Sequence, residues 1–343
     1  MTPTRRQAQR WDEDDVRVRP ARGKSRPRSK ERPQHLDAEH ARVIGVDRGR
    51  FSLRADDGRD MLAIKARELG RKGVVVGDSV WFVGGTDGGE DDLARIVRLD
   101  PRTTALRRTA DDSDPVERVI VANADQLGIV TSIIDPVPRP RLIDRALVAA
   151  INAGMQPLLI ITKADLANPA ELLAAYADVD VEIVTISRGE GKSPQPSDLQ
   201  RLRDILVDHT TVLVGHSGVG KSTLVNALVP GADRSTGMVN EVTGRGRHTS
   251  TSALALALPE GGWIIDTPGV RSFGLAHVSP DSVVNAFPDL TPGISECPRG
   301  CSHDEEECGL DAFVAGDPHA QARLASLRRL LASRGATESG QAG

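Results

Sequence analysis

The hydrophobic and polar positions of the chain first follow a period of two. Segment 41–58, ARVIGVDRGRFSLRADDG, alternates apolar and polar residues and then breaks at Asp57–Gly58, a pair typical of a hairpin turn. Two further runs, VVVGDSVWFVGG and LARIVRLDPR, follow after loops rich in Gly and Asp. Four or five short strands within about 70 residues favour a small barrel. We therefore predict an N-terminal OB-type β-barrel over residues 41–115.

From about Val119 the pattern changes to short, nearly continuous apolar runs. These runs are LGIVTSI, PLLIIT, VEIVTIS and TVLVG, as expected of parallel strands buried on both faces. A helix is predicted between the first two, ending at Gly154. Its apolar stripe comprises Ile143, Leu147, Ala150 and Ile151. Strands alternating with helices predict a doubly wound α/β domain over residues 116–273.

The remaining segments predict a hairpin and a helical C-terminal domain. The run SALALALPEGGWIIDTPG contains two apolar segments joined by a turn at 259–262. From 274 to 335 the chain is polar and ends in a helix whose apolar side comprises Leu324, Leu327 and Leu331. Elsewhere on this helix lie Arg323, Arg328 and Arg334. The helix therefore either docks against the core with a solvated face or contacts RNA.

Length and composition limit the class of protein. A chain of 343 residues with 39% hydrophobic and 27% charged residues is typical of a soluble protein of two or three domains. No apolar run approaches the roughly 18–20 residues that span a bilayer, and the N-terminus contains no secretory signal. We therefore expect a cytoplasmic monomer without a membrane partner. The three cysteines all lie within 297–308, which favours a metal site over a disulfide framework.

The charge is unevenly distributed. The whole chain has a formal net charge of −4, yet residues 1–36 contain 11 Arg or Lys against five acidic residues. We predict a basic disordered arm over 1–40 and a disordered tail over 336–343. The arm either binds nucleic acid or is a solvated tail. The predicted barrel has only Phe51, Trp81 and Phe82 as aromatic rings, so we expect any RNA contact there to depend on Arg and Lys.

One motif predicts a phosphate-binding loop. It follows an apolar strand and opens a helix, the context that distinguishes such a loop from a structural Gly-rich turn. Its residues are Gly215, His216, Ser217, Gly218, Val219, Gly220, Lys221, Ser222 and Thr223. Backbone N–H groups of the loop and the helix N-terminus favour phosphate. Lys221 is predicted to reach the β- and γ-phosphates, and the Ser222 hydroxyl to ligate Mg²⁺.

A second motif, Asp266-Thr-Pro-Gly269, ends another apolar strand. Asp266 occupies the position expected of the acidic residue that, together with Ser222, lies on the Mg²⁺ side of the site. The Gly269 N–H is placed to contact a γ-phosphate.

A third motif predicts recognition of guanine. Thr162, Lys163, Ala164 and Asp165 follow a buried strand. A carboxylate at Asp165 accepts hydrogen bonds from guanine N1 and N2, which adenine does not supply. Ser187, at the end of the next strand, is a candidate to support the base. The alternative for Asp165 is an ordinary helix N-cap.

The three motifs occur in the order base recognition, phosphate loop, acid, which is the order of a circularly permuted GTPase. With a barrel before them and a Cys/His cluster after them, residues 41–335 resemble the RsgA (YjeQ) family of small ribosomal subunit biogenesis GTPases. The resemblance implies GTP hydrolysis stimulated by the small (30S) subunit during late maturation, with rRNA contacts from the barrel and the zinc domain. The alternatives are a nucleotide-gated rRNA-binding scaffold without significant hydrolysis and an ATP-using P-loop enzyme.

The cysteine cluster predicts a structural zinc site. Three thiols and an imidazole within 12 positions match a closed tetrahedral set of ligands: Cys297, Cys301, His303 and Cys308. The usual spacing of the family is one residue longer in each outer gap. The alternative is a set of unbound buried thiols.

The catalytic group is the least determined feature. In Ras-like GTPases a Gln orients the attacking water, and here Val270 stands in that place. Segment 244–253, GRGRHTSTSA, resembles the first switch loop of the family. Thr249 or Ser250 is the candidate Mg²⁺ ligand, and His248 the candidate for positioning water. Alternatively, His248 contacts rRNA phosphate together with its neighbours Arg245 and Arg247.

Overall fold

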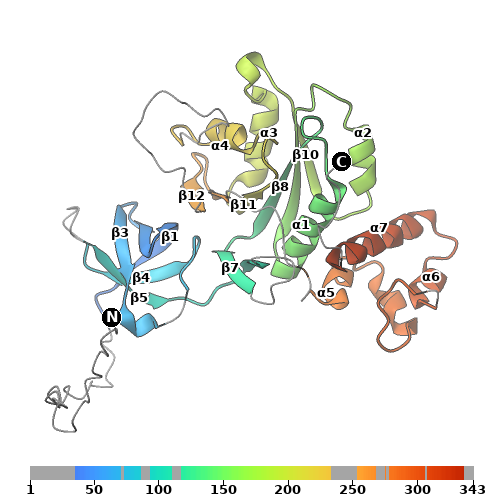
Figure 1. The fold of residues 1–343 in the computed structure, drawn as a ribbon, viewed down its shortest axis with the longest axis horizontal. Coiled ribbons are helices and arrows are strands. Elements are labelled where there is room, and N and C mark those ends of the chain that lie inside the picture. The colour runs from blue at the N-terminus through green and yellow to red at the C-terminus, as the bar shows by residue number, and fades with distance from the viewer. Residues whose placement is uncertain are drawn as a thin grey trace, which may run out of the picture. The chain divides into compact units, whose positions relative to one another are not determined.

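The computed structural model describes residues 35–70, 73–85, 93–109, 117–232, 253–267, 275, 278–305 and 307–335 (Figure 1). Nearly all of the predicted basic arm and the whole predicted C-terminal tail lie outside these residues. Among the described residues, no helix combines the length and the apolar character needed to cross a membrane.

An N-terminal closed β-barrel confirms the first prediction. It is formed by β1 (Glu39–Asp47), β2 (Arg50–Ala55), β3 (Asp60–Lys65), β4 (Ser79–Val83) and β5 (Ala94–Leu99), with the short helix η2 (Arg67–Leu69) after β3. The order β1-β2-β3-β5-β4 closes because β1 also pairs with β4, and β3 and β5 run parallel. This is the topology of an OB-type barrel. Its interior contains Val43, Phe51, Leu53, Phe82 and Ile96.

The turns of the barrel differ in one respect from the sequence prediction. The turn at Asp57–Gly58 joins β2 and β3 as predicted. The segment before it forms two strands rather than one, because the chain turns at Arg48–Gly49, where both φ angles are positive. The polar run Asp47, Arg48, Gly49 and Arg50 interrupts the apolar alternation at this point and is compatible with a turn, which the sequence analysis did not assign.

A separate antiparallel hairpin follows the barrel. It consists of β6 (Ala105–Thr109) and β7 (Glu117–Ala122), so the predicted boundary between residues 115 and 116 falls between two paired strands. Val76 forms a bridge with Val121, and the Ala122 N–H donates to the Val76 carbonyl at 3.0 Å. The hairpin is therefore hydrogen-bonded to the barrel.

The α/β domain has a six-stranded sheet in the order β10-β9-β8-β11-β13-β12. Its strands are β8 (Gln126–Ser132), β9 (Gln156–Thr162), β10 (Glu182–Ile186), β11 (Thr210–Val214), β12 (Leu254–Ala257) and β13 (Trp263–Asp266). The first five in this order are parallel, and β12 pairs antiparallel with β13. The four buried strands and the hairpin predicted from the sequence are thereby confirmed.

The helices pack on both faces of this sheet. They are α1 (Pro140–Ala153), α2 (Ala170–Tyr176), α3 (Pro196–Leu206) and α4 (Lys221–Leu228), with η3 (Glu190–Lys192) before α3. The core with α1 and the core with α3 and α4 lie on opposite sides, since alternate residues of the strands belong to one or the other. α1 ends at Gly154, whose left-handed φ of 69° is the predicted stop.

The barrel and the α/β sheet share hydrogen bonds. Gly45 of β1 pairs with Leu254 of β12. Beside this pairing, Arg42 donates to Thr210 Oγ1 at 3.0 Å, and its guanidinium lies 5.2 Å from the ring centroid of Trp263. The strands that lead to and from the predicted switch regions are therefore in direct contact with the barrel.

The C-terminal part is α-helical and contains the Cys₃His cluster. Its helices are α5 (Pro280–Val284), η4 (Thr291–Glu296), α6 (Gly309–Phe313) and α7 (Pro318–Gly335). α7 buries Leu324, Leu327 and Leu331 in the core that includes α1. Arg323 is 7% exposed and pairs with Asp289 and Asp180, while Arg328 pairs with Asp311. α7 therefore docks against the core, and its residues Arg323, Arg328 and Arg329 make intramolecular ion pairs, the last with Asp144.

Candidate functional site

The phosphate loop connects the fully buried strand β11 to α4. At Gly215 a Cβ atom would lie 2.4 Å from the Val130 carbonyl oxygen of the neighbouring strand, so a side chain is excluded there. Gly220 has a φ of 90°, which L-residues rarely adopt. These two glycines let the backbone turn sharply from the strand into the first turn of α4. The loop has the form that presents backbone N–H groups to an anion.

Lys221 and Asp266 are brought together by the parallel pairing of β11 and β13. Their side chains form an ion pair and are 13% and 6% exposed. Thr267, the next residue, donates from Oγ1 to the Leu213 carbonyl at 2.8 Å and fixes the end of β13 against β11. The carboxyl ends of parallel strands are where doubly wound sheets bind ligands. Two residues 45 positions apart in the sequence therefore meet at that edge.

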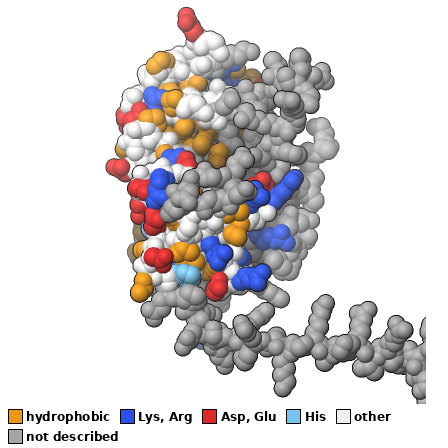
Figure 2. All heavy atoms as spheres, turned by 90° about the vertical axis from the view of Figure 1, so that its left-hand side faces the viewer, with side chains coloured by type: hydrophobic (Ala, Val, Ile, Leu, Met, Phe, Trp, Pro, Cys, Tyr) orange, Lys and Arg blue, Asp and Glu red, His pale blue; other side chains and the backbone are white. Residues whose placement is uncertain are grey.

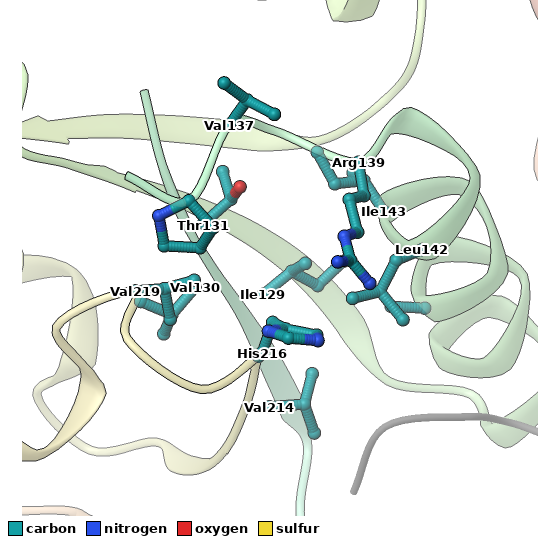
Figure 3. Close-up of a pocket in the computed structure, with 13 residues that line it drawn as sticks. Ile129, Val130, Thr131, Val137, Arg139, Leu142, Ile143, Val214, His216 and Val219 are labelled. Carbon is teal, nitrogen blue, oxygen red and sulfur yellow. The ribbon is translucent and has the colours of Figure 1, made fainter. Parts of the chain in front are cut away.

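A small hollow lies beside the phosphate loop (Figure 3). Apolar side chains of β8, β11 and α1 form most of its wall, among them Ile129, Leu142 and Val214. The His216 imidazole of the loop and the Arg139 guanidinium, just before α1, both point into it. Arg139 was not identified from the sequence, because it belongs to no motif and only the fold places it near the loop. It adds a permanent positive charge next to a predicted phosphate site.

Thr162 joins the predicted base loop to the phosphate loop. Its side chain is buried, and Oγ1 donates to the Val219 carbonyl at 2.6 Å, with the Thr131 carbonyl oxygen also within reach of the same proton at 3.2 Å. The first residue of this motif is usually Asn. Here a hydroxyl supplies the contact between the two loops. A buried hydrogen bond of this kind limits their relative movement.

The backbone after Thr162 directs Asp165 outward. Lys163 has a left-handed φ of 58° and donates from Nζ to the Asp135 carbonyl, while the Ala164 N–H donates to the Ile186 carbonyl at 3.1 Å. The N-cap alternative for Asp165 is wrong, because α2 begins only at Ala170 and its N-cap is Pro169. The Asp165 side chain is 26% exposed, so its carboxylate is accessible at the edge of the sheet.

The loop after β10 contacts this carboxylate directly. Ser187 is held by its N–H, which donates to Asp198 Oδ2 at 2.8 Å. Its neighbour Arg188 donates to Asp165 from the backbone N–H at 2.9 Å and from Nη2 at 2.9 Å. These hydrogen bonds, first those of the side chain, hold the pKa of Asp165 below its usual range. Sequence reasoning identified Ser187 but not Arg188, because a single Arg after a strand carries no pattern.

Four predicted site residues lie outside the described part of the chain: His248, Thr249, Ser250 and Gly269. The same holds for Val270 and for Arg245 and Arg247. Their roles remain predictions from the sequence.

The four predicted metal ligands converge. The ligand atoms of Cys297, Cys301, His303 and Cys308 all lie within 4.8 Å of one another. Cys297 Sγ is 3.8 Å from Cys308 Sγ and 3.6 Å from His303 Nδ1, and Cys308 Sγ is 3.9 Å from His303 Nδ1. A tetrahedron with Zn–S distances of about 2.3 Å has edges of about 3.8 Å. The shortened spacing in this chain therefore still permits a tetrahedral Cys₃His set, and the residues fit a zinc ion.

Polar groups around the cluster orient these ligands. Arg328 of α7 donates from Nε to the His303 carbonyl at 2.8 Å, and Glu305 accepts hydrogen bonds from the Ser302 N–H and the Cys301 thiol. Burial, together with this carboxylate, raises the pKa of Cys301 to about 12. A bound zinc ion would have to displace the thiol proton. Arg328 thus connects the metal loop to the helix that docks on the core.

Known proteins share both the sequence and the fold. A sequence model of the RsgA GTPase family matches residues 99–276, which is half of the chain. The small ribosomal subunit biogenesis GTPase RsgA of Pseudomonas aeruginosa is 38% identical over 273 residues, which cover 77% of each chain. The protein of the same name from Ectopseudomonas mendocina is 40% identical over 269 residues, covering 76% of this chain and 75% of its own length.

Two solved structures resemble this fold. YjeQ from Thermotoga maritima superposes with a TM-score of 0.64 at 23% identity, covering 87% of this chain and 98% of its own. YloQ, described as a circularly permuted GTPase, superposes with a TM-score of 0.59 at 24% identity over 89% and 97% of the two chains. At these identities the likeness concerns the fold alone. Together with the family match and the curated relatives, it leads to one conclusion: this chain belongs to the RsgA GTPase family.

Proposed function

We propose that this protein binds the small ribosomal subunit and hydrolyses GTP to GDP and phosphate during late maturation of that subunit. One observation carries the nucleotide part of the proposal. The base loop and the phosphate loop, 57 residues apart, are joined by the hydrogen bond from Thr162 to the Val219 carbonyl at one edge of the sheet. The ribosomal part depends on the relatives, whose names describe small-subunit biogenesis.

In this proposal each motif contacts a different part of GTP. Loop N–H groups bind the phosphates, and Lys221 exchanges its partner Asp266 for the β- and γ-phosphate oxygens. Bound Mg²⁺ would neutralise charge on those oxygens. Ser222, in the first turn of α4, would hold it directly, with Asp266 on the same side. Asp165 accepts from the guanine N1–H and N2–H groups.

Hydrolysis requires a group that positions water. Val270 has no polar atom for this purpose, so we propose His248, with Thr249 or Ser250 as the switch ligand of Mg²⁺ and Gly269 as the γ-phosphate contact. A histidine whose placement depends on the bound subunit would account for stimulation by that subunit. If His248→Ala turned over GTP on small subunits at the wild-type rate, this role would be excluded.

The barrel is the proposed rRNA contact, and cations rather than stacking rings support it. Phe51 and Phe82 are buried in the barrel interior, and the face of Trp81 is covered by Arg98, whose guanidinium lies 4.0 Å from the ring centroid. Lys and Arg side chains lie among acidic ones on the face drawn in Figure 2. Exposed barrel arginines include Arg50, Arg95 and Arg98. Binding should therefore weaken steeply with salt.

One structural Zn²⁺ held by Cys297, Cys301, His303 and Cys308 completes the proposal. It would fix the loop between η4 and α6 and, through Arg328, the position of α7.

The deciding experiment measures GTP turnover by the full chain alone, with purified small subunits, and with large subunits. We expect stimulation by small subunits only, and its loss in Lys221→Ala. Subunit binding that depends on GTP without faster turnover would favour the scaffold alternative. Equal displacement of bound GTP by ATP and GDP would favour the ATP-using alternative.

A further inference from the structure

Asp165, the proposed guanine-recognising carboxylate, is engaged on both oxygens by one neighbouring residue. Arg188 Nε lies 3.0 Å from Oδ2 and 3.4 Å from Oδ1, and Nη2 lies 2.9 Å from Oδ2. The Arg188 backbone N–H donates to Oδ1 at 2.9 Å. Both residues lie on loops that follow adjacent parallel strands, β9 and β10, so the fold itself places them side by side.

The guanidinium presents the same chemistry as the base. Guanine offers two neighbouring donors, N1–H and N2–H, to a carboxylate, and the arginine fork offers two neighbouring N–H donors to the same kind of acceptor. The side-chain donors therefore satisfy Asp165 as the edge of guanine would. Guanine and the Arg188 side chain compete for one acceptor.

We propose that Arg188 is a positioning residue that acts as an internal competitor of guanine and sets the affinity for GDP and GTP. The side chain must leave Asp165 before the base can bind, and it returns as the base departs. Arg188 thereby keeps Asp165 ionised and oriented while lowering the affinity for guanine nucleotides. This inference rests on the proposed recognition of guanine by Asp165.

The size of the effect follows from the exposure of the pair. The Arg188 and Asp165 side chains are 31% and 26% exposed, so solvent screens their attraction. The ion pair therefore lowers the affinity for guanine by only a modest factor. Because apparent affinity scales with the fraction of protein in the competent state, removing the side chain should tighten binding about two- to fivefold. The backbone N–H of residue 188 remains in any substitution.

The test uses the full chain with Mg²⁺ and compares three ligands: GDP, GTP and inorganic tripolyphosphate. Arg188→Ala should bind GDP and GTP about threefold tighter, within the same two- to fivefold range. Its affinity for tripolyphosphate, which has no base, should equal that of the wild type. The KM for GTP should fall by a similar factor with kcat unchanged. Arg188→Lys, which retains one donor group, should lie between Ala and the wild type.

Two further variants separate the possible failures. Arg201→Ala removes the same charge from an exposed position of α3 and should bind all three ligands like the wild type. Asp165→Asn should lose GDP affinity while keeping that for tripolyphosphate; if it does not, guanine recognition by Asp165 is wrong. If Asp165→Asn behaves as expected but Arg188→Ala binds GDP equally or more weakly, the competitor role of Arg188 is overturned. A tripolyphosphate affinity that rises together with that for GDP would also overturn it.

Discussion

Thr162 provides the sharpest test of how the two nucleotide loops are coupled. Thr162→Val keeps the shape of a buried β-branched side chain and removes only the hydroxyl that donates to the carbonyls of Val219 and Thr131. Thr162→Ser keeps the hydroxyl and serves as the matched control. Thr162→Ser loses only the methyl group, so comparing each variant with the wild type separates the hydrogen bond from the packing of the methyl group.

The magnitude follows from burial. Thr162 is 5% exposed and Val219 is 3% exposed, so water does not readily replace the lost donor. Removing one partner of a buried hydrogen bond costs about 1–3 kcal/mol. For a domain of this size such a loss corresponds to a fall in Tm of roughly 2–12 °C. The bond at 2.6 Å to the phosphate loop should account for more of this than the one at 3.2 Å to β8.

The coupling should also appear in binding. In Thr162→Val the base loop and the phosphate loop are no longer held in one geometry, so engaging both at once becomes less favourable. We expect GDP affinity to fall about three- to tenfold, with a smaller change for tripolyphosphate, which contacts the phosphate loop alone. Calorimetric titration and thermal unfolding measure both quantities. A Thr162→Val protein that melts and binds GDP like the wild type would refute the reasoning.

Three further predictions concern other parts of the chain. Cys308→Ser should reduce bound zinc from one equivalent to none, as measured by elemental analysis, and should lower the hydrogen-exchange protection of α7. Retention of one tightly held zinc ion would exclude Cys308 as a ligand. Hydrogen bonds from Arg323 lower the pKa of Asp289 below its ordinary value of 3.8. The ionised carboxylate therefore stabilises the folded protein at pH values above 3.8, and this stabilisation is lost as the pH falls through the lowered pKa. Asp289→Asn should therefore lower the free energy of unfolding, measured by urea titration, by less than about 1 kcal/mol at pH 7 given its exposure, and by less still at pH 3. An equal loss at both pH values would contradict the assignment. Gly77 has a φ of 89°, and a Cβ added there would lie 2.0 Å from the Ala122 carbonyl oxygen, so Gly77→Ala should lower the free energy of unfolding by more than about 3 kcal/mol or prevent folding. Gly58 has the same φ but open space around it, so Gly58→Ala should lower the free energy of unfolding by about 1 kcal/mol. Equal losses in the two variants would show that the clash at residue 77 is relieved.

The local features of this protein were determined by the sequence alone. The phosphate loop, the buried strands β8 to β11 and the stop of α1 at Gly154 all follow from patterns within a few residues, because backbone conformation and strand burial depend mainly on local periodicity and on glycine. The order of the motifs likewise predicted the permuted family. The zinc ligands converge as their spacing predicted, since one short loop carries all four.

Other features depend on contacts between residues far apart, and there the sequence was silent or wrong. The hairpin of β6 and β7 follows no pattern that periodicity detects. The N-cap alternative for Asp165 failed because the chain enters α2 four residues later than a cap would require.

The tertiary structure alone decided how the site is assembled. Thr162 looked like a departure from the usual Asn until packing placed its hydroxyl on the phosphate loop. Arg188 belongs to no motif, and only the parallel pairing of β9 and β10 brings it to Asp165. Motifs specify which groups are present, because their chemistry is local. Which groups meet is set by strand order and burial, because hydrogen bonds and ion pairs act only over a few ångströms.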